Sequence, residues 1–68
     1  MRKPEFNYEI VYRSRFGWWE DVVDIAETYK EALEIVERSK SCEEIRESFE
    51  LIQIRTYEDG KILKAIEL

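Results

Sequence analysis

The chain of 68 residues contains no histidine and a single cysteine, Cys42. Without histidine it lacks the commonest general base, a usual metal ligand and the side chain that most often changes charge near neutral pH. One cysteine excludes an intramolecular disulfide and a cysteine-type zinc site built from one chain. We therefore expect no metal and no cofactor. A small chain without disulfides is typical of a reducing, intracellular setting, so we expect the protein to be cytoplasmic.

Glycine, proline and long apolar runs are also scarce. Gly17 and Gly60 stand alone, whereas phosphate-binding loops need several glycines close together. The first twenty residues contain no continuous apolar run, so we expect neither a signal peptide nor a membrane-spanning segment. A chain this short builds one small domain over residues 1–68, with a modest core and no deep cleft.

Acidic residues are abundant, and they are unevenly distributed. The net charge is −5; residues 20–50 carry eleven acidic and four basic residues, whereas residues 1–15 carry four basic and two acidic ones. This balance disfavours nucleic acid as a partner, because affinity for nucleic acid comes mainly from neutralising phosphates. The acids either form the solvated side of a helix or suit a basic, nucleic-acid-binding protein. The candidate acidic face comprises Glu27, Glu31, Glu34, Glu37, Glu43 and Glu44.

The secondary structure follows from periodicity and turn residues. Phe6, Tyr8, Ile10 and Tyr12 alternate with mostly polar residues and predict a strand. A turn over 14–17 then leads into a second strand over 18–25. Thr28 and Glu31 form a capping box that opens a helix ending near residues 39–41.

A second capping box over 41–44 predicts a short helix or a kinked continuation, over about 42–48. Two further strands, 51–57 and 61–68, flank a two-residue Asp59-Gly60 turn. That turn places Tyr57 opposite Ile62, and puts both on the same outward face as Ile66.

These elements predict an α+β fold of order ββαββ. It consists of one four-stranded antiparallel sheet with one main helix packed on one face. The expected core is Phe6, Tyr8, Ile10, Ile25, Leu33, Val36, Ile52, Ile54 and Leu63.

Trp18 and Trp19 are the most informative pair in the chain. Neighbouring residues in a strand point to opposite faces, so only one tryptophan can join a core covered by a single helix. The pattern does not decide which of the two is buried. An outward aromatic beside arginines is typical of an interaction surface. The candidate partner-binding residues are Tyr12, Arg13, Arg15, Phe16, Trp18, Trp19, Tyr57, Ile62 and Ile66.

We therefore predict a non-enzymatic protein-binding module with a protein partner. The paired carboxylates of the chain fall on expected caps, turns and strands, where they do not converge in a cleft. One alternative is a structural homodimer, or a subunit of a larger assembly, packed sheet to sheet. Another is a sheet that stacks single-stranded nucleic acid on Tyr8, Tyr12, Trp18 and Trp19.

Residues 19–68 combine a strand, a helix opened by Thr-Tyr-Lys-Glu-Ala and a terminal Asp-Gly hairpin. In this layout, in size and in acidity, the chain resembles small accessory proteins of phages and mobile elements, some of which inhibit host defence, such as anti-CRISPR proteins. The resemblance implies a protein that binds and blocks a partner in the host cytoplasm, with the acidic segment 27–50 occupying a nucleic-acid channel. The chain departs from extreme mimics because it keeps eleven basic residues.

Overall fold

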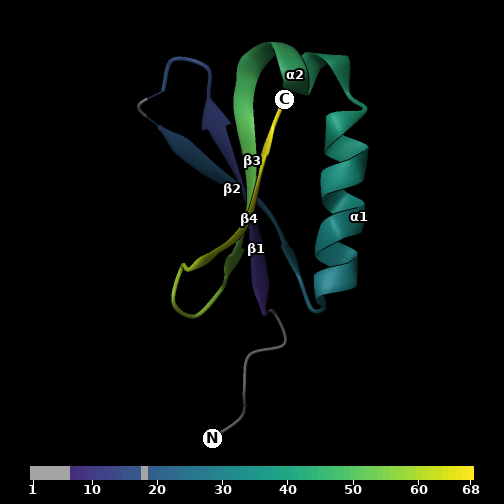
Figure 1. Cartoon of the computed structure of the whole chain (residues 1–68), viewed down its shortest axis with the longest axis vertical. Coiled ribbons are helices and arrows are strands. Elements are labelled where there is room, and N and C mark those ends of the chain that lie inside the picture. Colours follow the sequence, from purple (N-terminus) through teal and green to yellow (C-terminus); the bar gives the residue numbers. More distant parts are fainter. Residues whose placement is uncertain (1–6, 18) are drawn as a thin grey trace, which may run out of the picture.

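A computed structural model describes residues 7–17 and 19–68 and confirms the predicted α+β fold. The sheet has four antiparallel strands in the spatial order β2-β1-β3-β4, and the helix α1 runs alongside it (Figure 1). The elements are β1 (Tyr8–Ser14), β2 (Glu20–Ala26), α1 (Tyr29–Lys40), α2 (Glu43–Ser48), β3 (Phe49–Thr56) and β4 (Ile62–Glu67). Within this part of the chain, no helix is long and apolar enough to cross a membrane.

The core lies between α1 and the middle of the sheet. Its buried members are Ile10, Tyr12, Ala26, Ala32, Val36, Ile52 and Ile54. Ile10 pairs with Ile54, and Tyr12 with Ile52, so the central strands β1 and β3 present matched side chains to the helix. Burying these aliphatic side chains is the main source of stability in so small a domain.

Two expected core residues lie elsewhere. Ile25 pairs with Glu9 and is half-buried, and Leu63 is exposed. In β2 the extra residue is Val23, because Ile10 pairs with Asp24 while Val11 pairs with Val22. This bulge shifts the alternation of the strand, so Ala26 instead of Ile25 faces the core. Phe6, also expected in the core, lies outside the described residues.

The start of α1 matches its predicted cap. The Glu31 amide donates to Thr28 Oγ1 at 3.1 Å, and Glu31 Oε2 accepts from the Glu27 amide at 3.3 Å. Two amides of the helix entry are thereby satisfied. The helix ends at Lys40, where the Ser41 hydroxyl donates to the Glu37 carbonyl at 3.1 Å.

The capping box predicted for the second helix is wrong, although the helix itself forms. Cys42 is the N-cap of α2 and makes no side-chain hydrogen bond there. The Ser41 hydroxyl is already engaged with the end of α1, so it is not available to α2. Two helices that follow each other directly compete for the same capping serine.

The predicted register of β3 with β4 is also wrong, by one residue. Thr56 and Lys61 close a four-residue loop through a hydrogen bond from the Thr56 amide to the Lys61 carbonyl at 2.9 Å. Beyond this loop Arg55 pairs with Ile62, and then the extra residue Leu63 shifts the pairing, so that Ile54 pairs with Lys64 and Ile52 with Ile66. A shift of one residue exchanges the two faces of a strand. Ile66 consequently packs against the core instead of facing outward with Ile62.

Candidate functional site

The turn between β1 and β2 presents the most exposed large apolar side chain among the described residues. Phe16 is 81% exposed. The turn itself is well ordered by hydrogen bonds: the Gly17 amide donates to the Ser14 carbonyl at 2.9 Å, and the Phe16 amide to Ser14 Oγ at 3.1 Å. Gly17 has a φ of 81°, a left-handed conformation that other residues rarely adopt. Ser14 is fully buried, so the turn is fixed at its base.

A second set of hydrogen bonds ties this turn to α2. Arg15 Nε donates to the carbonyls of Arg46 and Glu47, each at 2.9 Å, and the Arg15 amide donates to the Ser48 carbonyl at 3.2 Å. The last carbonyls of a helix have no partner within the helix and carry its negative dipole end, so a guanidinium suits them. Arg15 therefore acts as a clamp that holds the turn against α2, and its side chain is committed within the molecule.

Trp19 extends the core toward the same end of the sheet. Its ring meets that of Phe49 edge to face, with centroids 5.9 Å apart, and Phe49 meets Tyr12 in the same way at 4.9 Å. Trp19 is nevertheless 40% exposed. We call Ser14–Gly17 together with Trp19 the hairpin tip. Trp18, the other tryptophan among the predicted partner-binding residues, lies outside the described residues.

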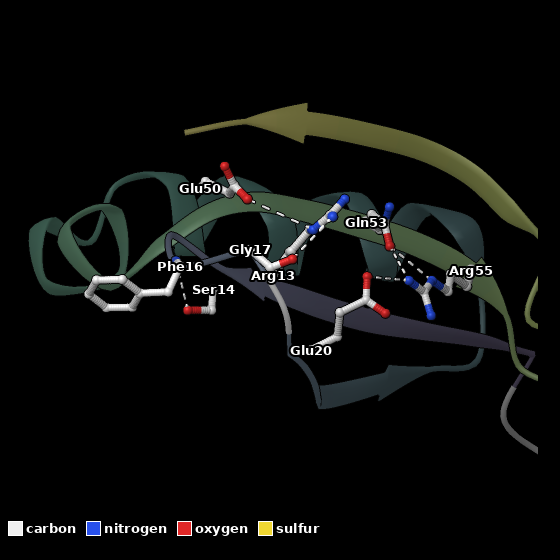
Figure 2. A network of polar contacts seen from close by, with 8 residues as sticks. All are labelled: Arg13, Ser14, Phe16, Gly17, Glu20, Glu50, Gln53 and Arg55. Atoms are coloured by element: carbon white, nitrogen blue, oxygen red, sulfur yellow. Dashed lines mark hydrogen bonds and ion pairs between the residues drawn. The ribbon is translucent and has the colours of Figure 1, made fainter.

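The sheet face opposite α1 carries a polar network where an apolar patch was expected. Arg55 donates to Glu20 Oε2 at 2.8 Å and to Gln53 Oε1 at 2.9 Å (Figure 2). Gln53 pairs with Val11 in the ladder, and Val11 is only 1% exposed. The long polar side chains of Gln53 and Arg55 thus cover Val11 at the centre of this face. In the sequence, polar Gln53 and Arg55 alternate with apolar Ile52 and Ile54, and this alternation could have predicted a polar outer face for β3.

Comparisons with known protein families, with curated proteins and with solved structures returned no match.

The structure separates the residues of the predicted partner-binding patch. Tyr12 is buried in the core, where its hydroxyl bonds to Ser39, so it is not available to a partner. Tyr57 and Ile62 are about half exposed, but Tyr57 is in the β3–β4 loop and Ile62 begins β4, and that loop is at the opposite end of the sheet from the β1–β2 turn (Figure 1). Arg13 is at the hairpin end, 3.8 Å from Glu50 and 3.3 Å from the Gly17 carbonyl.

The predicted acidic face is exposed throughout, but it is mixed with basic residues. Glu34 and Glu37 of α1 line the same shallow surface as Lys30 and Arg38, and Glu37 lies 3.8 Å from Lys40 Nζ. Glu31 accepts a hydrogen bond at the helix start, and Glu27 provides the amide for it. Glu43 and Glu44 occupy the first turn of α2, where acidic side chains favour the helix dipole. Capping and solvation account for these positions.

Groups suited to covalent or metal chemistry do not come together in the described part of the chain. Ser39 Oγ donates to the Ile35 carbonyl at 2.9 Å, so the Tyr12 hydroxyl donates to it in turn; within the described residues neither hydroxyl is hydrogen-bonded to a carboxylate or an amine, although Asp24 lines the same pocket. Among the described residues, every buried side-chain nitrogen and oxygen has a hydrogen-bond partner, and no cluster of potential metal ligands is found. The hairpin tip is therefore the strongest candidate site, and it is suited to binding.

Proposed function

We propose that the chain is a protein-binding module that inserts Phe16 into an apolar pocket of a partner protein. The observation that supports this most is an 81% exposed aromatic ring on a turn held by hydrogen bonds on both sides. Leaving such a ring in water forgoes the hydrophobic gain of burying it, which is about 2 kcal/mol or more for a phenylalanine. A partner pocket would recover that gain.

The fixed backbone of the turn favours binding further. A flexible loop must be ordered when it binds, which costs about 0.5–1.5 kcal/mol for each immobilised side chain. Here the Arg15 clamp and the Ser14 hydrogen bonds order the turn in the free protein. Trp19, with part of its indole exposed, supplies a second aromatic surface at the same end. Large aromatics are the residues most often found at the energetic centres of interfaces.

Two other functions have less support. Stacking of single-stranded nucleic acid would use Tyr8 and Tyr12, but both face α1; Tyr8 packs edge to face on Tyr29 at 5.7 Å. Inhibition of a host-defence or nucleic-acid-processing complex, implied by the resemblance to phage accessory proteins, is a finer form of the binding proposal. The mixed charges on α1 do not favour the acidic-channel version of it.

Substitution at the hairpin tip tests the proposal. A binding partner is first isolated from extracts of the source organism with the wild-type chain, and its affinity is then measured by titration calorimetry with purified proteins. Phe16→Ala is expected to weaken binding by about 2 kcal/mol, or roughly 30-fold. Its free energy of unfolding is expected to change by less than about 0.5 kcal/mol, because the ring makes few contacts.

Tyr57→Ala is the matched control, because Tyr57 is also an exposed aromatic in a loop but lies at the other end of the sheet. It should bind the partner within about twofold of wild type. A partner that binds the Phe16→Ala variant as tightly as wild type would refute the proposal.

A further inference from the structure

Strand β4 is apolar yet uncovered. Helix α1 packs mainly against β1 and β2, and α2 against β3, so within residues 7–17 and 19–68 the only extensive neighbour of β4 is β3. Ile62 is 50% and Leu63 42% exposed, and Lys64 and Ala65 are exposed as well. An outer strand with apolar side chains and unpaired backbone groups is a template for pairing with another strand.

The hydrogen-bonding pattern shows which backbone groups of β4 face the free edge. The Leu68 amide donates to the Glu50 carbonyl of the neighbouring strand at 3.0 Å. Backbone groups of successive residues point alternately to the two sides of a strand. Ile66 and Lys64 therefore also face β3, whereas the amides and carbonyls of Ala65 and Glu67 face outward.

Residues 64–68 form a regular stretch. The irregularity between Ile54 and Arg55 makes Leu63 the extra residue of β4, and this bulge lies near the start of the strand. Beyond it the pairing with β3 is continuous, through Lys64, Ala65, Ile66 and Glu67. A bulge twists an edge away from pairing, so one near the start leaves the rest of the strand able to pair.

The opposite edge of the sheet is protected. Its bulge residue, Val23, lies in the middle of β2, and Glu20, Asp21 and Asp24 place three acidic side chains along that strand. Both features are common defences against edge-to-edge association. An added strand therefore fits at β4 and not at β2.

We propose that β4 pairs antiparallel with β4 of a second copy of this chain, about a two-fold axis at Ile66. The Ala65 amide then donates to the Glu67 carbonyl of the second copy, and the Glu67 amide to the Ala65 carbonyl. By symmetry four hydrogen bonds form, and they satisfy the outward groups of the regular stretch. The two sheets become one sheet of eight strands. This inference does not depend on the proposed function, which uses the turn between β1 and β2.

Self-complementarity is what favours a second copy as the occupant. In this register Ile66 meets Ile66, Lys64 faces Leu68, and Glu67 faces Ala65, so no like charges lie directly opposite each other. Ile66, half-buried against the core of one copy, would be covered by the other. A two-fold axis perpendicular to the sheet places both α1 helices on the same face. Each lies over β1 and β2, away from the axis, so the helices do not collide.

Proline at the free edge tests the pairing with little effect on the fold. Ala65→Pro removes an amide that faces away from β3, so no hydrogen bond within the monomer is lost. Ala65→Val is the matched control, because it keeps the amide and favours a strand. Sedimentation equilibrium from about 10 μM to about 1 mM should show a dimer for wild type and for Ala65→Val. Ala65→Pro should raise the dissociation constant about 30-fold, as expected for two lost hydrogen bonds.

Amide hydrogen exchange of the wild-type chain gives a second, independent measurement. The Ala65 and Glu67 amides should become protected as concentration rises, whereas the Ile66 amide should be protected at all concentrations. A monomer over the whole range would overturn the proposal, as would unchanged association of Ala65→Pro. Phe16→Ala should dimerise like wild type, so the failure of one proposal is distinguishable from failure of the other.

Discussion

The two halves of the sheet use similar apolar alternation with different results. In the β1–β2 half, α1 covers the face, and Ile10, Tyr12 and Ala26 are buried beneath it. In the β3–β4 half, the inner strand β3 is buried, but most of β4 is exposed although Ile62, Leu63 and Ala65 are apolar. One helix of twelve residues cannot cover four strands. Which apolar residues become core is therefore decided by where the helix lies.

The two halves also differ in how their edges are protected. The β2 edge combines a central bulge with three acids, whereas the β4 edge has a bulge near its start together with Lys64 and Glu67. A small domain exposes much of its surface and has few residues to spare for protection. Acids on one edge and apolar side chains on the other favour the proposed pairing at β4 over pairing at β2.

The largest expected effect is a contrast in stability between the halves. Ile10→Ala, in the covered half, should lower the free energy of unfolding by about 3–4 kcal/mol, because the residue is fully buried. Ile62→Ala, in the uncovered half, should lower it by less than about 1 kcal/mol. Urea denaturation, at concentrations where the chain is monomeric, measures both. Similar losses for the two variants would contradict the burial contrast.

A smaller effect is expected at the bridge between the halves. Arg55 of β3 reaches across β1 to Glu20 of β2 and also holds Gln53 (Figure 2). Arg55→Ala should lower the free energy of unfolding by about 1–2 kcal/mol. It removes the hydrogen-bond donor to the buried side-chain oxygen of Gln53, and it uncovers Val11. Glu20→Gln is the control for charge alone and should cost about 0.5 kcal/mol, less at high salt, because the pair is partly exposed. An equal cost for both variants would show that packing over Val11 contributes nothing.

The smallest expected change in stability concerns the protected edge. Replacing both Asp21 and Asp24 with Thr should alter the free energy of unfolding by no more than about 0.5 kcal/mol. Each copy would then have two unprotected edges, and two edges permit open-ended growth. Light scattering should therefore detect assemblies larger than a dimer. The absence of such growth at high concentration would indicate that the bulge at Val23 protects β2 without the acids.

The sequence was sufficient for the fold wherever the structure depends on short-range patterns. Alternation in 8–12, the Thr28 cap and the Gly17 turn all predicted elements that the structure contains. The β3–β4 register was not predictable in this way. The Asp59-Gly60 pair is typical of a two-residue turn, but the Thr56 hydroxyl accepts from the Lys61 amide at 3.0 Å and favours the longer loop. The longer loop by itself keeps the two faces of β4 in place, and it is the extra residue Leu63 that turns Ile66 toward the core.

The hairpin tip was predictable only in part. Phe16 and Trp19 were identified from their residue type and position. The role of Arg15 was not, because its acceptors, the carbonyls of Arg46 and Glu47, lie more than thirty residues away in the sequence. Alternation placed Tyr12 on the same face as Ile10, but its burial was missed because the partner of its hydroxyl, Ser39, lies on α1. Long-range partners of polar groups leave no periodic trace in a single sequence.

The strand order β2-β1-β3-β4 has a consequence for how the chain folds. Each outer strand pairs with a neighbour close in sequence, so the two hairpins, β1–β2 and β3–β4, form from local contacts. Joining them requires β1 to meet β3 across the whole of β2, α1 and α2, and closing that long loop costs entropy before the Ile10–Ile54 contact offsets it. We expect this docking to limit the folding rate. Stopped-flow measurements should then show that Ile54→Val slows folding, whereas Val22→Ala, in an outer strand, mainly changes unfolding.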